Sequence, residues 1–358
     1  MTSPKVIVGM SGGVDSSVAA LLLQQQGYAV EGLFMVNWQE DEEAYCSAAD
    51  DLQDARRVCD VLGIPLHQVD FSAQYRAQVF DYFLAEYRAG RTPNPDVLCN
   101  REIKFGTFYD YARRLDAGYI ATGHYARVEV SKTQVQLLRG RDTAKDQSYF
   151  LHQAPSDALR RTLFPLGQLT KNEVRNMAFE HGLHNHARRD STGICFIGER
   201  PFKEFLSRYL PAQPGDIVTD DDTVVGRHDG LMFHTLGQRQ GLGVGGLQGY
   251  PDGPWYVVHK DIPGNRLIIG QDGNHPLLLS RRVVTGPVHW VNQPGAGRLQ
   301  IKIRYRQKDQ DGVLTITPEG GDIQFDSPQR AVAPGQFAVF YDGEQCLGGA
   351  VIESYHSQ

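Results

Sequence analysis

The sequence predicts an α/β protein with a doubly wound parallel-sheet domain, followed by a small β-rich central domain and a C-terminal β-barrel-like domain. Two observations support this prediction. Over residues 1–125, strand-like runs alternate with amphipathic helical segments, an alternation typical of parallel sheets. Beyond residue 211, stretches rich in Gly and Pro separate short alternating runs, as in small β domains and barrels. We therefore place the domains at 1–210, 211–275 and 276–358.

The individual elements follow from local patterns. Residues 5–8 form a β-branched run, which predicts a buried strand. Val14, Val18 and Leu21 then fall at helical spacing, and Gly27 is placed to end that helix. Similar signals predict strands at 29–36, 65–69, 119–122, 299–305 and 336–341, helices at 47–62 and 75–90, and a mostly helical region over 155–210.

The connection between the first strand and the first helix reads Gly-Met-Ser-Gly-Gly-Val-Asp-Ser over residues 9–16. Its glycines let backbone N–H groups approach an anion, and the N-terminus of the following helix attracts negative charge. A Walker loop would carry a lysine, and none occurs between Gly9 and Gln26. The segment predicts a phosphate-binding turn, with an ordinary strand–helix turn as the alternative. The first domain is thus expected to bind a nucleotide where Gly9, Met35 and Gly123 meet at strand ends.

Composition limits the classes of protein that the chain can belong to. Its 358 residues are 41% hydrophobic and 22% charged, as in ordinary globular proteins. No apolar run approaches 18 residues and no charged-then-apolar N-terminus occurs, so neither a membrane span nor a signal peptide is expected. Five cysteines in this length do not indicate a disulfide scaffold, and we expect a cytoplasmic protein. The net charge of −6 means that a nucleic acid would need a local basic patch.

Cys99 lies in a polar loop that two prolines, Pro93 and Pro95, stiffen. Asp96 precedes it by three residues, which on a helical turn puts carboxylate and thiol on one face. A carboxylate alone would disfavour the thiolate, so we expect Asp96 to accept or donate a proton. Nearby basic residues would favour the thiolate: Arg91, Arg101 and Lys104. The alternative is a small buried apolar cysteine.

Cys195 lies between Gly193 and Gly198 and follows the Arg188-Arg189 pair, which would lower its thiol pKa at close range. The alternative is again a packed cysteine. Packing is the preferred interpretation for Cys46, Cys59 and Cys346. The histidines of segment 181–186 have no second ligand cluster at suitable spacing, so no metal site is predicted.

Taken together, the motifs resemble those of the tRNA-specific 2-thiouridylase family of PP-loop ATP pyrophosphatases. The resemblance covers nearly the whole chain, and two of its motifs centre on a cysteine. The matching segments are 11–16 (Ser-Gly-Gly-Val-Asp-Ser), 92–100 (Thr-Pro-Asn-Pro-Asp-Val-Leu-Cys-Asn), 121–125, 145–150, 190–198 (Asp-Ser-Thr-Gly-Ile-Cys-Phe-Ile-Gly), 234–239 and 346–349.

The resemblance implies a sulfurtransferase reaction. ATP, with Mg²⁺ on the nucleotide, adenylates the C2 oxygen of the wobble uridine in tRNA. A persulfide donor protein, either a cysteine desulfurase or a sulfur-relay protein, loads sulfur onto Cys195, and its terminal sulfur attacks C2. Cys99 then releases the sulfur and forms a disulfide with Cys195, while Asp96 manages the proton. The products are 2-thiouridine, AMP and pyrophosphate.

The resemblance also implies which residues bind each substrate. ATP is expected to contact Gly9, Met10, Ser11, Gly12, Gly13, Val14, Asp15, Ser16, Met35 and Gly123. The target base, flipped out of the anticodon stack, is expected to meet Asn94, Pro95 and Asp96. Other tRNA contacts are expected from His124, Lys145, Asp146, Gln147, Arg304, Tyr305 and Gln336.

A basic segment over residues 298–308 offers phosphate contacts despite the negative net charge. Alternation along an extended strand would put four cations on one face: Lys302, Arg304, Arg306 and Lys308. A solvated strand face is the alternative.

Two other functions compete with thiolation. One is another PP-loop ligase or amidotransferase, which would not need two motif cysteines or a basic β domain. The other is a non-catalytic tRNA-binding or sulfur-carrier protein with a vestigial loop, against which the intact Ser11, Asp15 and Ser16 argue.

Overall fold

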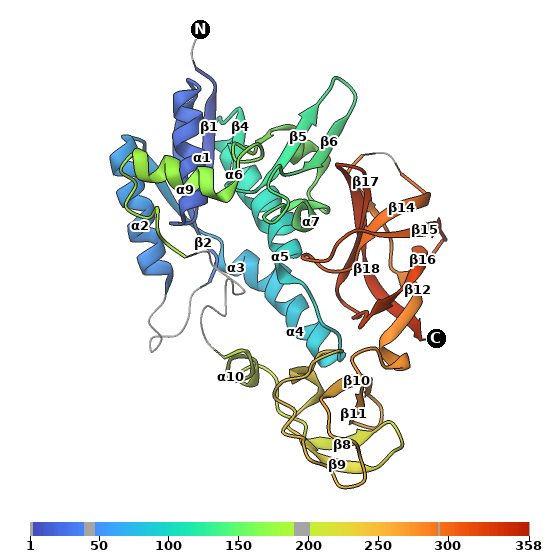
Figure 1. Ribbon diagram of the computed structural model, residues 1–358. Helices are drawn as coiled ribbons and strands as arrows, with labels where there is room; N and C mark the ends of the chain where they lie inside the picture. Colours follow the sequence, from blue (N-terminus) through green and yellow to red (C-terminus); the bar gives the residue numbers. More distant parts are fainter. Residues whose placement is uncertain (1–2, 39–46, 190–200, 293, 358) are drawn as a thin grey trace.

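The computed structural model describes residues 3–38, 47–189, 201–292 and 294–357 (Figure 1). Its first domain is built on a parallel sheet with strand order β3-β2-β1-β4-β7. These strands are β1 (Lys5–Met10), β2 (Ala29–Val36), β3 (Leu66–Asp70), β4 (Tyr119–Ala121) and β7 (Thr162–Leu163).

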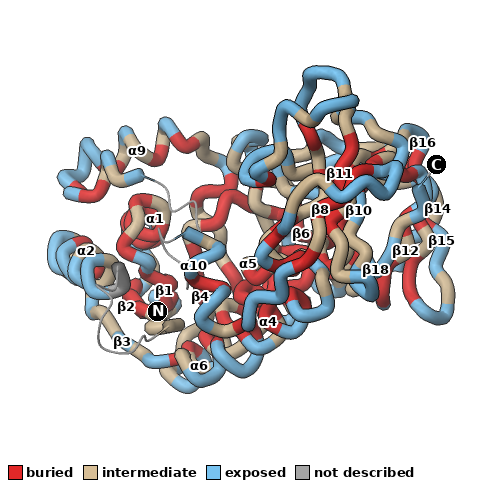
Figure 2. The backbone as a smooth tube through the Cα atoms, turned by 90° about the horizontal axis from the view of Figure 1, so that it is seen from below, coloured by how far each residue is buried: buried red, intermediate tan, exposed pale blue. Residues whose placement is uncertain are grey.

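Helices cover both faces of this sheet, which confirms the doubly wound prediction. Val6 and Val8 of β1 pack in one core with helices α1 (Val14–Gln25), α2 (Ser47–Leu62) and α9 (Lys171–Glu180). Ile7 faces the other core, which contains α4 (Asp81–Arg88), α5 (Pro95–Leu98) and α6 (Phe108–Arg114). Figure 2 shows the buried tube of β1 between these layers. Strand order reverses between β1 and β4, and such switch points are where open α/β sheets bind ligands.

The helical regions differ in detail from the prediction. Segment 75–90 is helical as expected, although it begins with α3 (Ser72–Tyr75) and passes through a π-helical turn at Arg76–Phe80. Residues 95–114 form a further helical run, with a π-helical stretch at Cys99–Thr107 between α5 and α6. The region 155–210 contains strand β7, which is too short to leave a periodic signal. Its described helices are α8 (Ser156–Arg160), α9 and α10 (Phe202–Ser207), and α7 (Ser148–Leu151) precedes it.

The central β-rich domain holds a sheet with strand order β10-β11-β8-β9. Its core includes Ile217, Val257, Leu267 and Ile269, which come from three of the four strands. The strands are β8 (Gly215–Thr219), β9 (Val224–His228), β10 (Trp255–Asp261) and β11 (Arg266–Gln271), with 3-10 turns at Leu231–Phe233 and Pro276–Leu278.

Six strands of the C-terminal domain close into a barrel within the described residues, because β12 pairs with both β16 and β18. Ile301, Phe325, Phe340 and Ile352 fill its interior. The strands are β12 (Leu279–Thr285), β14 (Gly297–Lys302), β15 (Gln310–Ile316), β16 (Gly321–Arg330), β17 (Phe337–Asp342) and β18 (Gln345–Ser357), and β13 (His289–Trp290) pairs with β18.

The barrel is joined to the first domain by shared strand pairing. Strand β18 also pairs with β6 (Val135–Arg139), with Cys346 opposite Leu137, and β6 pairs in turn with β5 (Ala126–Val130). Sequence reasoning missed this hairpin, which extends from the catalytic domain toward the barrel in Figure 1.

The prediction of one basic strand face over 298–308 is wrong. Strand β14 ends at Lys302, and the backbone N–H of Ile303 donates to the side-chain oxygen of Gln307 at 2.9 Å. That local bond competes with the sheet ladder and turns the chain. Lys302 is buried and Arg304 exposed, so their side chains do not form a common solvent face.

Among the described helices, none has both the length and the apolar character required to cross a membrane.

Candidate functional site

The phosphate loop lies between β1 and α1 at the switch point of the sheet. Gly12 has φ +76°, and a Cβ there would lie 2.4 Å from the carbonyl oxygen of Asp51, so only glycine fits. The Ser16 hydroxyl donates to the Gly13 carbonyl at 3.0 Å and accepts from the Ser11 N–H at 3.2 Å. Gly13 precedes α1 and provides no side-chain cap. The first-turn N–H groups are therefore oriented to receive an anion.

Asp15 in the first turn of α1 is paired with a lysine from a distant part of the chain. The Nζ of Lys171 donates to its two carboxylate oxygens at 2.8 and 2.9 Å, and the Tyr125 hydroxyl donates at 2.8 Å. Lys171 begins α9 behind a capping box made by Thr170 and Glu173. Its side chain is buried beside the phosphate loop. The loop itself has no lysine of the kind that a Walker loop carries.

Sequence reasoning did not find Lys171, although one signal was present. A cation in the first turn of a helix opposes the helix dipole, so its occurrence there indicates a nearby anion.

The strand ends meet closely at this point. A Cβ on Gly123, just after β4, would lie 2.7 Å from the carbonyl carbon of Asp15 and from the nitrogen of Ser16. A Cβ on Gly9 would lie 3.4 Å from the Cε of Met35 in β2. The structure thus brings Gly9, Met35 and Gly123 to the region of the loop.

Two further residues hold the loop from outside: Asn185, which the sequence analysis missed, and Arg188, which it assigned only to the surroundings of Cys195. The side-chain amide of Asn185 donates to the Gly12 carbonyl at 2.8 Å and to the Ser17 hydroxyl at 2.9 Å. Arg188 pairs with Asp54 at 2.6 Å and with Asp51. Burial raises the pKa of Asp51, and the Arg188 charge opposes that rise.

Cys99 is buried one helical turn after Asp96, as predicted from their spacing. Burial raises the pKa of the Asp96 carboxyl, while the charge of Lys104 opposes the rise. A carboxyl group in this environment holds a proton more readily than an exposed one, which suits a group that exchanges a proton with a neighbouring thiol. The expectation that Arg91 and Arg101 act on the thiol is not supported, because their charges are paired with the carboxylates of Glu86 and Glu102.

Cys195 and its motif lie outside the described residues, as does Cys46. Cys59 and Cys346 are buried in cores, which agrees with their interpretation as packing residues.

His124 is buried at the end of β4 and is held in one tautomer. The Nζ of Lys104 lies 3.4 Å from its Nε2, and the Thr122 hydroxyl lies 2.7 Å from its Nδ1. Because an ammonium group only donates, Nε2 accepts and Nδ1 carries the proton that is donated to Thr122. Burial, followed by the Lys104 charge, lowers the pKa of His124 well below its usual value. His124 is therefore neutral.

Comparisons with known proteins identify the family. Three family models match in succession: the tRNA methyl transferase HUP domain at residues 4–199, the tRNA methyl transferase PRC-barrel domain at 203–271, and the aminomethyltransferase beta-barrel domain at 280–352. The tRNA-specific 2-thiouridylase MnmA of Pseudomonas paraeruginosa is 60% identical over 354 residues, which covers 98% of this chain and 94% of the relative. The chain belongs to the tRNA-specific 2-thiouridylase family.

A second relative agrees with this assignment. The 2-thiouridylase of Pseudomonas putida GB-1 is 57% identical over 366 residues, or 99% of this chain and 98% of the relative. Among solved structures, a 4-thiouridine synthetase–RNA complex with bound ATP aligns over 58% of this chain and 50% of that chain. Its 19% identity and TM-score of 0.37 are too low to support an inference about function.

Six of the residues that the resemblance to 2-thiouridylases assigns to tRNA form two groups in the structure. In the first group, Asp146 is buried and accepts from the N–H groups of Gly140 and Ser148, and Gln147 accepts from the N–H of Tyr125. These side chains shape the loop that carries Lys145, whose carbonyl accepts from the Tyr305 hydroxyl at 3.3 Å.

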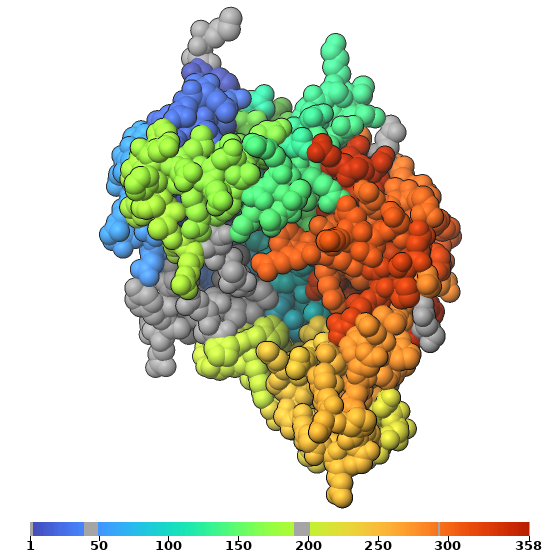
Figure 3. All heavy atoms as spheres, in the orientation of Figure 1, coloured from blue at the N-terminus to red at the C-terminus, as the bar shows by residue number. Residues whose placement is uncertain are grey.

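The second group, Arg304 and Gln336, lies on the barrel near Thr92. Figure 3 shows the molecular face where the catalytic, central and barrel domains meet around a hollow.

Proposed function

We propose that this chain is a tRNA-specific 2-thiouridylase that uses ATP to activate the wobble uridine of tRNA and then replaces its C2 oxygen with sulfur. The observation that carries this proposal is the phosphate loop at the switch point, in which Asp15 and Lys171 form an ion pair. Family membership, together with the buried Cys99 and its neighbour Asp96, supports the thiolation chemistry.

The phosphate loop supports ATP binding through three features. Backbone N–H groups at the start of α1 receive phosphate oxygens, and Lys171 supplies the positive charge that a Walker loop takes from its own lysine. Asp15 is about one-third exposed. Its carboxylate fits a Mg²⁺ ion that is held mainly by the phosphates. The other residues proposed to contact ATP are Gly9, Met10, Ser11, Gly12, Gly13, Val14, Ser16, Met35 and Gly123.

In the proposed activation step, the uridine C2 oxygen attacks the α-phosphorus and pyrophosphate leaves. The resulting adenylate gives C2 a good leaving group, AMP, in place of a poor one.

Sulfur transfer is proposed to use the two motif cysteines. The terminal sulfur of a persulfide on Cys195 attacks C2, and AMP departs with the original oxygen. The Cys99 thiolate then attacks the inner sulfur of Cys195, which breaks the S–S bond and leaves sulfur on C2. Asp96 accepts the Cys99 proton, and a Cys99–Cys195 disulfide remains. An external thiol must return two electrons before the next turnover.

Binding of tRNA is proposed to involve Asn94, Pro95 and Asp96 at the target base. Further contacts are proposed from His124, Lys145, Asp146, Gln147, Arg304, Tyr305 and Gln336. A partner protein that carries a persulfide is proposed to supply the sulfur, and the enzyme is proposed to act in the cytoplasm. The domain boundaries 1–210, 211–275 and 276–358 stay predictions.

The experiment that tests this function combines ATP, Mg²⁺, a persulfide source and unmodified tRNA. Release of AMP and pyrophosphate, with 2-thiouridine in the tRNA, is expected; methyl transfer, which two of the matching domain descriptions name, would produce neither. The Asp15→Ala variant should lose adenylation and keep its tRNA affinity. Asp157→Ala is the matched control, since Asp157 is an exposed aspartate in the first turn of α8. Wild-type AMP formation by Asp15→Ala would contradict the assignment of the loop.

A further inference from the structure

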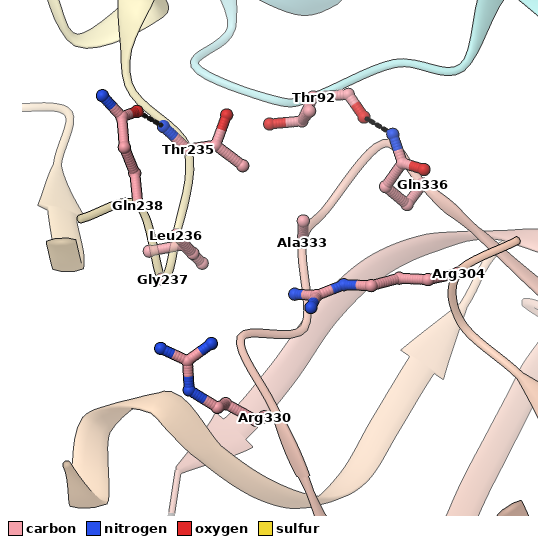
Figure 4. A pocket seen from close by; sticks show the side chains of 9 residues that line it. All are labelled: Thr92, Thr235, Leu236, Gly237, Gln238, Arg304, Arg330, Ala333 and Gln336. Atoms are coloured by element: carbon pink, nitrogen blue, oxygen red, sulfur yellow. Dashed lines mark hydrogen bonds between the residues drawn. The ribbon is translucent and has the colours of Figure 1, made fainter. Parts of the chain in front are cut away.

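A cavity of about 530 Å³ lies where the three domains meet (Figure 4). The catalytic domain contributes Thr92, the central domain contributes the loop 235–238, and the barrel contributes the remaining walls. Those barrel residues are Arg304, Arg330, Ala333 and Gln336. The lining therefore has two positive charges and no acidic side chain.

The two guanidinium groups extend into the same space, between Ala333 and the loop 235–238 (Figure 4). Although the Arg304 residue as a whole is exposed, the surrounding protein removes part of the water from its guanidinium, which lowers its pKa; the nearby charge of Arg330 lowers it further. Two cations that repel one another at a shared cavity are stabilised when an anion binds between them.

Carboxylates neutralise other arginines of the barrel but not this pair. Arg282 and Arg298 form ion pairs with Asp322 and Asp326. Within the described ranges, Arg304 and Arg330 have no such ion pair, and their hydrogen bonds go to the carbonyls of Ala331 and Gly273.

Arg330 is already held in position. Its guanidinium lies over the ring of Tyr256, 5.4 Å from the centroid, while its Nε donates to the Gly273 carbonyl. Gly237 gives it room, because a Cβ there would lie 3.1 Å from one Nη of Arg330. A cation fixed before binding loses little conformational freedom when it receives a ligand.

One wall of the cavity continues into the segment proposed to meet the target base. The side-chain amide of Gln336 donates to the carbonyls of Thr92 at 2.8 Å and Pro93 at 3.3 Å, and the Thr92 N–H donates to the Pro334 carbonyl at 2.8 Å. Asn94 follows Pro93 directly. An anion in the cavity would therefore lie beside the base-binding segment.

We propose that this cavity binds a phosphodiester group of the RNA chain next to the target nucleotide, with Arg330 as the second cation beside Arg304. The proposal rests on the tRNA substrate of the proposed function and adds to it a phosphate site assembled from all three domains. A guanidinium is well suited to this role, since its planar donor fork matches the oxygens of a phosphate.

The test compares Arg330→Gln with Arg282→Gln, a matched control on the same barrel. Binding of unmodified tRNA is measured across a range of salt concentrations. Arg330→Gln should weaken binding by roughly fivefold to tenfold at about 0.1 M salt and flatten the salt slope by roughly one unit. Arg282→Gln should change neither quantity. Arg330→Lys, which keeps the charge, should restore most of the slope, and equal thermal unfolding of all variants shows that the fold is retained.

A second measurement identifies the phosphate. An RNA stem-loop with one uncharged methylphosphonate linkage beside the target uridine should bind the wild type more weakly than the unmodified stem-loop does. The difference in affinity between the two RNAs should be smaller for Arg330→Gln than for the wild type, because only Arg304 remains to contact the phosphate. Equal salt slopes for the wild type and Arg330→Gln would overturn the proposal. The proposal would also be overturned if Arg330→Gln weakened the binding of ATP or inorganic phosphate and left the binding of RNA unchanged, because the cavity would then hold a different phosphate. Absence of thiolation by the wild type would count against the proposed function instead, while the binding slopes still decide the phosphate site.

Discussion

Replacing Gly123 with alanine tests whether the phosphate loop depends on the close contact between two strand ends. The added Cβ would lie 2.7 Å from the backbone of Asp15 and Ser16, so these segments must separate by about 0.7 Å to reach an ordinary 3.4 Å contact. Both partners are backbone, and no side-chain rotation can relieve the clash. Overpacking of this kind lowers the free energy of unfolding by about 1–3 kcal/mol. The corresponding fall in Tm is roughly 2–10 °C for a domain of this size.

The larger effect is expected on activity. A displacement approaching 1 Å at a reacting centre can cost about 100-fold in rate. We expect kcat/KM for AMP release from labelled ATP to fall by roughly 10- to 100-fold in Gly123→Ala, with tRNA affinity unchanged.

Gly118→Ala is the matched control, because Gly118 precedes the same strand and its Cβ would lie 3.6 Å from the Lys5 carbonyl oxygen, an ordinary contact. AMP release at the same rate in both variants and the wild type would refute the packing argument.

The remaining predictions address the thiols, the RNA and the buried side chain of His152. Cys99→Ser and Cys195→Ser should each abolish thiolation, seen by mercury-gel retardation of tRNA, and retain ATP binding; normal thiolation in either variant would exclude the two-cysteine mechanism. Arg304→Ala should weaken the binding of all tRNAs and flatten the dependence of affinity on salt by roughly one unit of slope. Asn94→Ala should lower turnover and leave that slope unchanged. If Arg304→Ala weakened the binding of some tRNAs much more than that of others, a phosphate contact would be excluded. Burial lowers the pKa of His152 in the folded protein from 6.5 to about 3. Between these two pH values the unfolded chain binds a proton that the folded protein does not, so the folded state loses stability as the pH falls through this range. His152→Gln should therefore reduce the drop in Tm between about pH 7 and pH 5, and an equal drop in both proteins would contradict this cause.

Features formed by residues that lie close together in the sequence could be predicted from it. The phosphate loop is one example, since a β-branched run, a glycine cluster and helical spacing follow one another within residues 5–25. Asp96 and Cys99 are another, because one helical turn sets their relation. The partners of Asp15 could not be predicted in this way. Lys171 lies 156 residues further along the chain, and only the folded sheet brings the start of α9 to the loop.

The failed prediction at 298–308 has a different cause. Alternation of charged and apolar residues specifies a strand only while the backbone groups pair with a neighbour. Pairing of β14 with β17 reaches Lys302 and stops there, and the side chain of Gln307 takes the next N–H group. One local hydrogen bond thus redirects Arg304 from a strand face to the three-domain cavity.

Strand β18 sets an order of events during synthesis. Hairpin β5–β6 belongs to the catalytic domain, yet one edge of β6 receives its partner only from β18. The side chain of Arg139 bonds to the carbonyl of Gly343, 204 residues later. At about 5–20 residues per second, a ribosome needs roughly 10–40 s to cover that interval. During this time the nascent catalytic domain exposes an unpaired edge, which is open to chaperones and to mispairing. The sheet of the catalytic domain is therefore completed only when the C-terminal barrel has been made. A fragment released before that point would lack the barrel and would keep the edge of β6 unpaired.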